Sequence, residues 1–182
     1  TYPNGGRALV DLDLRGERGE IFGYLGPNGA GKSTTIRLLL DLIRPTAGQA
    51  AIAGLDTRAR DVEARRRVGY LPGDLRLSDR LSGREQLDSL GRLRGGVDHA
   101  TRDALVERFD CVLDRPIREL SKGNRQKLGV VQAFMHRPDL VILTLHNPDA
   151  TLPFRLGEAT AVILSPKSAA TTATQPVGTG PF

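Results

Sequence analysis

The stretch GPNGAGKST, at residues 26–34, constrains the fold of this chain more than any other feature. It matches the spacing G-x-x-x-x-G-K-[ST] and lies between a short apolar segment, residues 21–25, and a segment with helical spacing, residues 33–43. Glycines let the backbone curl so that successive N–H groups point at phosphate oxygens, and the following helix adds its positive end. The stretch predicts a phosphate-binding loop; the alternative is an ordinary glycine turn before a helix.

Two side chains of this loop have specific predicted roles. The amino group of Lys32 would neutralise the β- and γ-phosphates of a nucleotide, and the hydroxyl of Ser33 would ligate Mg²⁺. The other predicted cofactor-binding positions of the loop are Gly26, Asn28, Gly29, Ala30, Gly31 and Thr34. A phosphate loop of this kind occurs in kinases, GTPases and many ATPases, so a second motif is needed to choose among them.

Strand and helix signals alternate along the chain, which predicts the α/β class with a P-loop NTPase sheet. Short apolar or alternating runs predict strands, and longer runs with helical spacing and capping residues predict helices. The expected strands are residues 10–14, 21–25, 49–52, 68–71 and 140–143. The expected helices are residues 33–43, two helices within residues 82–109 capped by Ser82 and Asp98, and a helix from the Ser121 cap to about His136.

Charge and composition exclude several classes of protein. The formal net charge is +5, but the arginines are interleaved with acids, and only three Tyr and five Phe are present to stack on bases, so no nucleic-acid partner is expected. The sequence has no apolar run long enough to span a membrane and no leader-like N-terminus, which predicts a cytoplasmic chain. Cys111 is the only cysteine, and we expect it to be a packing residue.

The second motif is ELSKGNRQK, at residues 119–127, about ninety residues after the phosphate loop. With this motif the chain resembles the nucleotide-binding domain of ABC transporters, whose signature sequence has this form. The resemblance implies ATP and Mg²⁺ as cofactors, and a second ATP-binding subunit whose ATP is contacted by Leu120, Ser121, Gly123 and Asn124. Taken alone, LSKGN is simply a good helix cap.

Two further stretches support the resemblance. Tyr2 stands where the family places an aromatic side chain that stacks on adenine; a half-exposed terminal tyrosine is the alternative. The stretch VGYLPGDLRLSDRLSGREQL, residues 68–87, resembles the linker into the family's helical subdomain, here about residues 74–120. Together with LSKGNRQKLG, residues 120–129, it most resembles ATPase subunits of drug and antibiotic exporters. It implies a transmembrane permease as partner and a peripheral location at the inner face of the cell membrane.

The chain departs from the family after residue 143. ABC ATPases follow the matching strand with an Asp that holds Mg²⁺ and a Glu that polarises the attacking water, whereas this chain has Thr144 and Leu145. Leu145 cannot accept a proton, and substitution by His146 or Asp149 is disfavoured because a one-residue shift reverses the direction of a strand side chain. Loss of general-base assistance slows a reaction roughly 10²- to 10⁴-fold. We therefore expect no catalytic residue here and impaired hydrolysis.

The chain differs from the family in two other ways, one that bears on ATP hydrolysis and one that bears on the length of the domain. The family usually has a glutamine at the position of Gly73, and the neighbouring Asp74 is either a substitute or a solvated loop acid. The family's later histidine has no counterpart, and the opening strand is missing. We therefore expect residues 1–143 to be a truncated ABC-type domain.

Residues 144–182 have a different composition: Asp149, Arg155, Glu158 and Lys167 are their only charged residues. With N-P-D-A, ILSPK and PVGTGPF, this segment resembles a piece of the extracytoplasmic solute-binding proteins of peptide and nickel importers, although generic loop chemistry is an alternative. The leading hypothesis is an ATP-binding subunit of an exporter with impaired hydrolysis. The alternatives are a nucleotide-binding module that does not hydrolyse ATP, or a chimeric fragment joined near residue 143.

Overall fold

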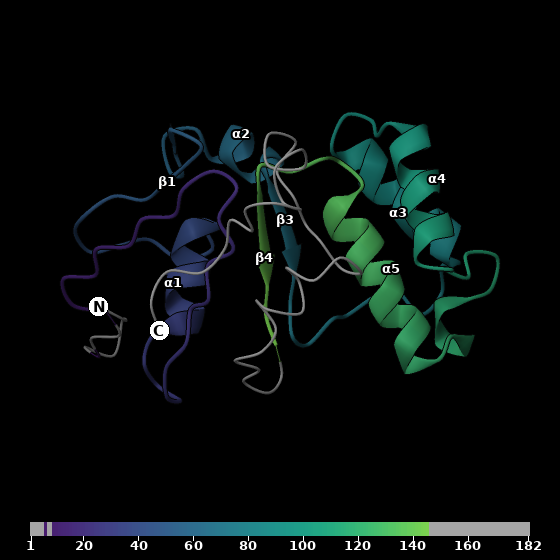
Figure 1. Cartoon of the computed structure of the whole chain (residues 1–182), viewed down its shortest axis with the longest axis horizontal. Helices are drawn as coiled ribbons and strands as arrows, with labels where there is room; N and C mark the ends of the chain where they lie inside the picture. Colours follow the sequence, from purple (N-terminus) through teal and green to yellow (C-terminus); the bar gives the residue numbers. More distant parts are fainter. Residues whose placement is uncertain (1–5, 7–8, 146–182) are drawn as a thin grey trace, which may run out of the picture. The chain divides into compact units, whose positions relative to one another are not determined.

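The structure is a computed structural model that describes residue 6 and residues 9–145 (Figure 1). Tyr2, His146, Asp149 and the rest of the segment compared with solute-binding proteins lie outside the described residues. The described residues form two compact units, one ending at Gly48 and the other covering residues 49–145.

The first unit contains helix α1, Lys32–Leu39, which follows the phosphate loop directly. The helix ends four residues before the predicted end at residue 43. Asp41 adopts a left-handed conformation with φ 53°, and Leu42 N–H donates to the carbonyl of Arg37 at 2.8 Å. Asp41 N–H donates to the carbonyl of Leu38 at 3.0 Å, which completes a Schellman motif. The helix therefore stops at this turn, before Pro45 can end it.

The strands predicted at residues 10–14 and 21–25 are not formed in the described part of the first unit. Both segments are without secondary structure, and their alternating apolar side chains, such as Leu12 and Phe22, are exposed. A strand needs a neighbour to complete its ladder of hydrogen bonds, and within the described residues neither segment forms one. The prediction of these two strands was wrong because it used local pattern alone.

The second unit begins with short elements. Strands β1, Ala51–Ile52, and β2, Leu55–Asp56, pair antiparallel, so the predicted strand at residues 49–52 is confirmed only in its second half. Helix α2, Asp61–Arg66, leads into strand β3, Val68–Leu71.

Strand β3 pairs in parallel with β4, Leu140–Leu143, so segments far apart in the sequence lie side by side (Figure 1). The register aligns Val68 with Leu140 and Leu71 with Leu143. Thr144 N–H donates to the carbonyl of Leu71 at 2.9 Å, which continues the ladder past the end of β4. Both strands were predicted, and the ladder brings their carboxyl ends to one edge.

Three helices were predicted in this unit, and all three are confirmed: α3, Gly83–Leu93; α4, His99–Arg108; and α5, Lys122–Phe134. Their predicted caps form as well. Ser82 and Glu85 make a reciprocal capping box, Asp98 accepts from Ala100 N–H, and Ser121 accepts from Asn124 N–H. A 3₁₀ turn, Ile117–Glu119, precedes α5. Within the residues described here, none of the helices is long and apolar enough to cross a membrane.

The buried core of this unit lies among α3, α4, α5 and the segment before α5. Its members are apolar side chains with almost no exposed surface: Leu87, Leu113, Ile117, Leu120, Leu128, Val131 and Met135. Cys111 packs against this cluster, which confirms its expected role. Burial raises the pKa of its thiol, and this keeps Cys111 in the uncharged form that suits an apolar contact.

Helix α5 approaches strand β3 more closely than side chains would normally allow. A Cβ atom on Gly69 would lie 2.1 Å from the carbonyl oxygen of Ala133, and a Cβ on Gly129 would lie 2.4 Å from Leu75 Cδ2. Two glycines thus let the helix backbone rest on the strand and on the loop that follows it. This contact connects the helix that Ser121 caps to the strand that ends at Leu71.

Candidate functional site

The phosphate loop has the backbone that its glycines predict. Gly29 and Gly31 have φ values of 85° and 88°, a left-handed conformation that other residues rarely adopt. Ala30 N–H donates to the carbonyl of Pro27 at 3.2 Å, which closes a turn inside the loop. Gly31 is the N-cap of α1 and supplies no side-chain acceptor, so no side chain at the N-cap competes with an external anion at this helix end.

Lys32 folds back over this loop. Its amino group donates to the carbonyl oxygens of Gly26 at 2.6 Å and Pro27 at 2.8 Å. An ammonium group has three donor hydrogens, so one remains for an incoming phosphate. Since the first turn of α1 contains no acidic residue, the positive charge of Lys32 is not neutralised within that turn.

Two residues that the sequence analysis missed, Tyr24 and Thr35, stabilise the loop through hydrogen bonds. The Tyr24 hydroxyl lies 3.1 Å from Thr35 Oγ1, and Thr35 Oγ1 donates to the carbonyl of Gly31 at 3.2 Å. Thr35 is buried, so this chain of hydrogen bonds fixes the backbone at the N-cap of α1. Neither residue is a fixed position of the motif. The only sequence signal for this hydrogen bond is that a hydroxyl-bearing residue stands on each side of the loop.

The residues present fit a nucleotide triphosphate and its metal ion. The loop combines a helix N-terminus that has no side-chain cap with one cation, and Ser33 is exposed in the first turn of α1, where its hydroxyl is accessible to a metal ion. Across residues 9–145, no group of three or more His, Cys, Asp or Glu side chains gathers at a possible metal site. The Ser33 hydroxyl would ligate a bound Mg²⁺ together with phosphate oxygens.

The predicted signature residues lie at the start of α5 in the second unit. Ser121 is exposed, and its hydroxyl accepts from Asn124 N–H at 3.2 Å. Among the described residues, a Cβ on Gly123 would meet only Ser121 Oγ, 3.9 Å away, so their packing does not require glycine there. Leu120, by contrast, is buried in the core, and its carbonyl accepts from Arg125 Nε at 3.1 Å. Leu120 therefore anchors the segment while Ser121 and Gly123 remain open to solvent.

The carboxyl ends of β3 and β4 carry the expected departures from the family. Thr144 Oγ1 is buried and has no hydrogen-bond partner, while Leu145 is exposed. A Cβ on Gly73 would lie 3.3 Å from the Thr144 carbonyl oxygen, so the two positions are neighbours in space. Asp74 is exposed and forms an ion pair with Arg76 at 3.0 Å, as a solvated loop acid does. No carboxylate therefore occupies these strand ends within the described residues.

Comparison with known proteins connects this geometry to a family. A family model described as "ABC transporter" matches residues 9–144. The chain is 36% identical over 142 residues to "ABC transporter ATP-binding protein NatA" of Bacillus subtilis (strain 168), covering 75% of this chain and 58% of that protein. It is 37% identical over 145 residues to "Daunorubicin/doxorubicin resistance ATP-binding protein DrrA" of Streptomyces peucetius, covering 77% of this chain and 44% of that protein.

A solved structure described as "Dimeric Structure of MJ0796, a Bacterial ABC Transporter Cassette" superimposes with a TM-score of 0.64 at 21% identity, covering 75% of this chain and 65% of that chain. At this identity the likeness shows the fold alone, and it confirms the predicted P-loop NTPase fold. The chain spans about half the length of the curated relatives it matches. The family match covers most of the sequence and includes both the phosphate loop and the ELSKGNRQK motif, and on this ground the chain belongs to the ABC transporter family.

Proposed function

We propose that this chain is the ATP-binding subunit of an ABC transporter of the exporter type. The observation that supports this most directly is the phosphate loop, in which two left-handed glycines precede an uncapped helix N-terminus and Lys32 lies across the loop. The match to a daunorubicin/doxorubicin resistance protein favours export over import. The permease partner and a location at the cytoplasmic face of the membrane follow from this proposal.

In the proposed site the loop amides and Lys32 bind the β- and γ-phosphates of ATP. Asn28, Ala30 and Thr34 belong to the same loop and first turn, with Ser33 as the metal ligand. When bound, Mg²⁺ would neutralise charge on the phosphate oxygens. Tyr24 and Thr35 position the loop through their hydroxyl groups and would not touch the nucleotide.

The signature residues are proposed to contact ATP held by a second ATP-binding subunit. Ser121 offers a hydroxyl, Gly123 leaves its backbone uncovered, and Asn124 lies on the same first turn of α5. Glycine inside a helix costs about 1 kcal/mol relative to alanine. Because nothing among the described residues crowds Gly123, a requirement from a partner nucleotide would explain why a costly residue stands there.

Slow hydrolysis is part of the proposal. Thr144 and Leu145 offer no carboxylate to hold Mg²⁺ or to polarise water, and Gly73 beside them offers no side chain at all. Nucleotide binding does not need these groups, whereas in-line attack by water does. The chain would therefore bind ATP and release phosphate slowly.

Residues 144–182 are proposed to be unrelated to the ATP-binding domain, because the family match ends at residue 144. Their resemblance to solute-binding proteins rests on sequence motifs alone. The uninterrupted coding sequence across codons 138–150 tests whether one reading frame encodes this join. A reading frame broken between residues 143 and 144 would support the proposal that residues 144–182 are unrelated to the ATP-binding domain. A continuous frame, with the same sequence on both sides of residue 143 in close relatives, would contradict it.

The proposed nucleotide site is tested by equilibrium binding of a fluorescent ATP analogue to the full chain. Lys32→Gln removes the loop cation and is expected to weaken binding at least tenfold, since a charge-assisted hydrogen bond contributes about 1.5–3 kcal/mol. Arg37→Gln is the matched control: it removes an exposed positive charge from the last turn of the same helix and should leave the affinity unchanged. Equal affinity in both variants would remove the basis of the proposal.

A further inference from the structure

The beginning of helix α5 carries two positive charges that have no carboxylate partner within the described residues. Lys122 is the first residue of the helix, and its exposed amino group makes no hydrogen bond or ion pair within residues 9–145. We infer that Lys122, supported by Arg125, binds the terminal phosphate of the ATP that a second subunit holds. This inference rests on the proposed function and adds two residues that were not among the predicted signature contacts.

The guanidinium of Arg125 is fixed beside the turn that leads into Ser121. Its Nε donates to the carbonyl of Leu120 at 3.1 Å, and its Nη2 donates to the carbonyl of Arg118 at 3.0 Å. Both acceptors are uncharged, and they take two of the five N–H donors of the guanidinium. Arg125 therefore keeps its positive charge and its remaining donors next to the hydroxyl of Ser121.

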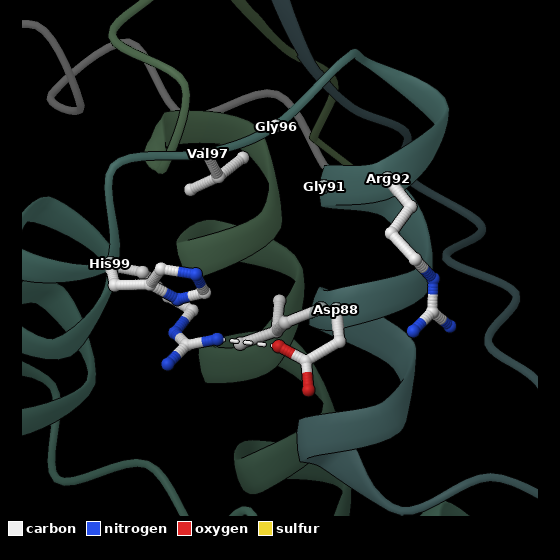
Figure 2. Close-up of a pocket in the computed structure, with 8 residues that line it drawn as sticks. Asp88, Gly91, Arg92, Gly96, Val97 and His99 are labelled. Atoms are coloured by element: carbon white, nitrogen blue, oxygen red, sulfur yellow. Dashed lines mark hydrogen bonds and ion pairs between the residues drawn. The ribbon is translucent and has the colours of Figure 1, made fainter.

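Several other cations of the same unit show the usual arrangement, in which a carboxylate takes up the charge. The dashed line in Figure 2 marks the ion pair between Asp88 and Arg102, in the cavity between α3 and α4. Closer to the motif, Arg118 pairs with Glu119 at 3.8 Å. The two cations at the start of α5 differ from these because no acid of the described residues pairs with them.

The dipole of α5 makes its first turn an unfavourable place for a cation. The N-terminus is the positive end of a helix, where acidic residues are stabilising and basic residues belong at the opposite end. Helices α2 and α3 follow this rule, with Asp61 and Glu85 in their first turns and arginines in their last turns. Helix α5 has no acid in its first turn and no cation in its last turn. Such departures from local preference are expected where residues serve a function.

The same arrangement occurs in α1. Lys32 is the first residue of α1 and Lys122 is the first residue of α5, and neither helix has an acid in its first turn. In α1 this lysine is proposed to bind the β- and γ-phosphates of the chain's own nucleotide. Lys122 offers the same group, an ammonium with three donors on a flexible stem, to a phosphate that approaches α5 from outside.

The terminal phosphate of a nucleoside triphosphate matches this charge. In the proposed dimer the phosphate loop of one subunit holds that phosphate, and the start of α5 from the other subunit faces it. A nucleoside diphosphate lacks the group that Lys122 would bind. Lys122 should therefore strengthen the association of two chains in ATP much more than in ADP.

The test measures the dimer of the full 182-residue chain. A trace of fluorescently labelled chain is titrated with unlabelled chain in Mg²⁺ with saturating ATP or ADP, and the dimer is detected by sedimentation velocity. We expect association at least tenfold tighter in ATP than in ADP. A symmetric dimer contains two Lys122 contacts. Lys122→Gln in one chain should weaken association in ATP about tenfold, and the same change in both chains about a hundredfold.

Two variants serve as controls. Lys122→Arg keeps the positive charge and should restore most of the association that Lys122→Gln loses. Arg108→Gln removes an exposed positive charge from the last turn of α4 and should leave association unchanged.

Binding of a fluorescent ATP analogue to the unmodified chain, at a dilution where it is monomeric, tests the phosphate loop separately. Failure to bind the analogue would contradict the proposed function itself. If the chain binds ATP, the role of Lys122 is overturned when the chain stays monomeric. It is also overturned when Lys122→Gln and Arg108→Gln associate equally well, or when Lys122→Gln weakens association in ADP as much as in ATP.

Discussion

Gly73 and Thr144 lie side by side, with 3.3 Å between the position of a Cβ on Gly73 and the Thr144 carbonyl oxygen. They are 71 positions apart in the sequence, and the parallel ladder between β3 and β4 brings them together. Gly73 stands where the family resemblance leads one to expect a glutamine, and Thr144 stands where it leads one to expect an aspartate. The missing groups therefore belong to one place in the fold, and their effects on hydrolysis should be coupled.

The first prediction follows from this relationship. Replacing Thr144 by Asp and Leu145 by Glu together should raise Mg²⁺-dependent phosphate release by roughly 10²-fold or more, because a metal ligand and a general base are supplied. Gly73→Gln added to this double variant should raise the rate of phosphate release further. The increase should be larger than the one that Gly73→Gln alone produces in the unmodified chain. Single-turnover phosphate release from bound ATP measures each step.

The control for this series is Thr144→Asn with Leu145→Gln, which matches the size of the added groups but supplies no charge. It should leave the rate near that of the unmodified chain. Rapid phosphate release by the unmodified chain itself would show that the acids are not needed and would contradict the proposed impairment.

Thr144 also leads to a prediction about stability. Its hydroxyl is buried without a hydrogen-bond partner, and such a group costs roughly 1–3 kcal/mol. Thr144→Val keeps the shape and removes the unpaired group, so the free energy of unfolding should rise by about 1 kcal/mol in urea titrations. Thr57→Val is the matched control. The buried Thr57 hydroxyl donates to the Ala50 carbonyl at 3.2 Å, so this replacement should lower the free energy of unfolding.

The two glycines of α5 should respond in opposite directions to replacement by alanine. Gly129→Ala would put a Cβ 2.4 Å from Leu75 Cδ2, and the resulting overpacking should lower the free energy of unfolding by about 1–3 kcal/mol. Gly123→Ala meets nothing closer than 3.9 Å and should raise it by up to about 1 kcal/mol through helix propensity. Urea unfolding of both variants decides this, and loss of stability in both would show that Gly123 is also a packing residue.

The pH dependence of stability should report on His136. Burial lowers the pKa of His136 below its ordinary value of 6.5, and the positive charge of Arg94 lowers it further. The unfolded chain therefore takes up the proton first as the pH falls. The contribution to the free energy of unfolding is complete above about pH 6.5 and decreases as the pH falls below this value.

Urea titrations between pH 5 and 8 measure this slope. His136→Gln keeps a donor for the Val68 carbonyl, which His136 Nε2 contacts at 3.0 Å, and should remove the histidine part of the slope. His99→Gln changes an exposed ring and should leave the slope in place. An unchanged slope in His136→Gln would mean that other groups carry the pH dependence.

Local signals predicted the helices of the second unit well. Ser82, Asp98 and Ser121 each cap the helix that the sequence assigned to them, because a cap joins a side chain to an amide two or three residues away. The phosphate loop is equally local, since Gly29, Gly31 and Lys32 interact within a few residues. Such features depend on neighbours in the sequence and can be identified without knowledge of the fold.

Other features required the tertiary structure. Residues 21–25 have a strand pattern but form no strand in the described chain, because a strand needs a partner that its own sequence does not contain. The Tyr24–Thr35 support of the loop and the α3–α4 cavity likewise depend on packing. Sequence alone thus determined the phosphate loop, the helix caps and the absence of an acidic pair at residues 144 and 145. Only the fold decided that Gly73 meets Thr144 and that α5 rests on Gly69, because contacts between distant residues arise when chain segments pack together.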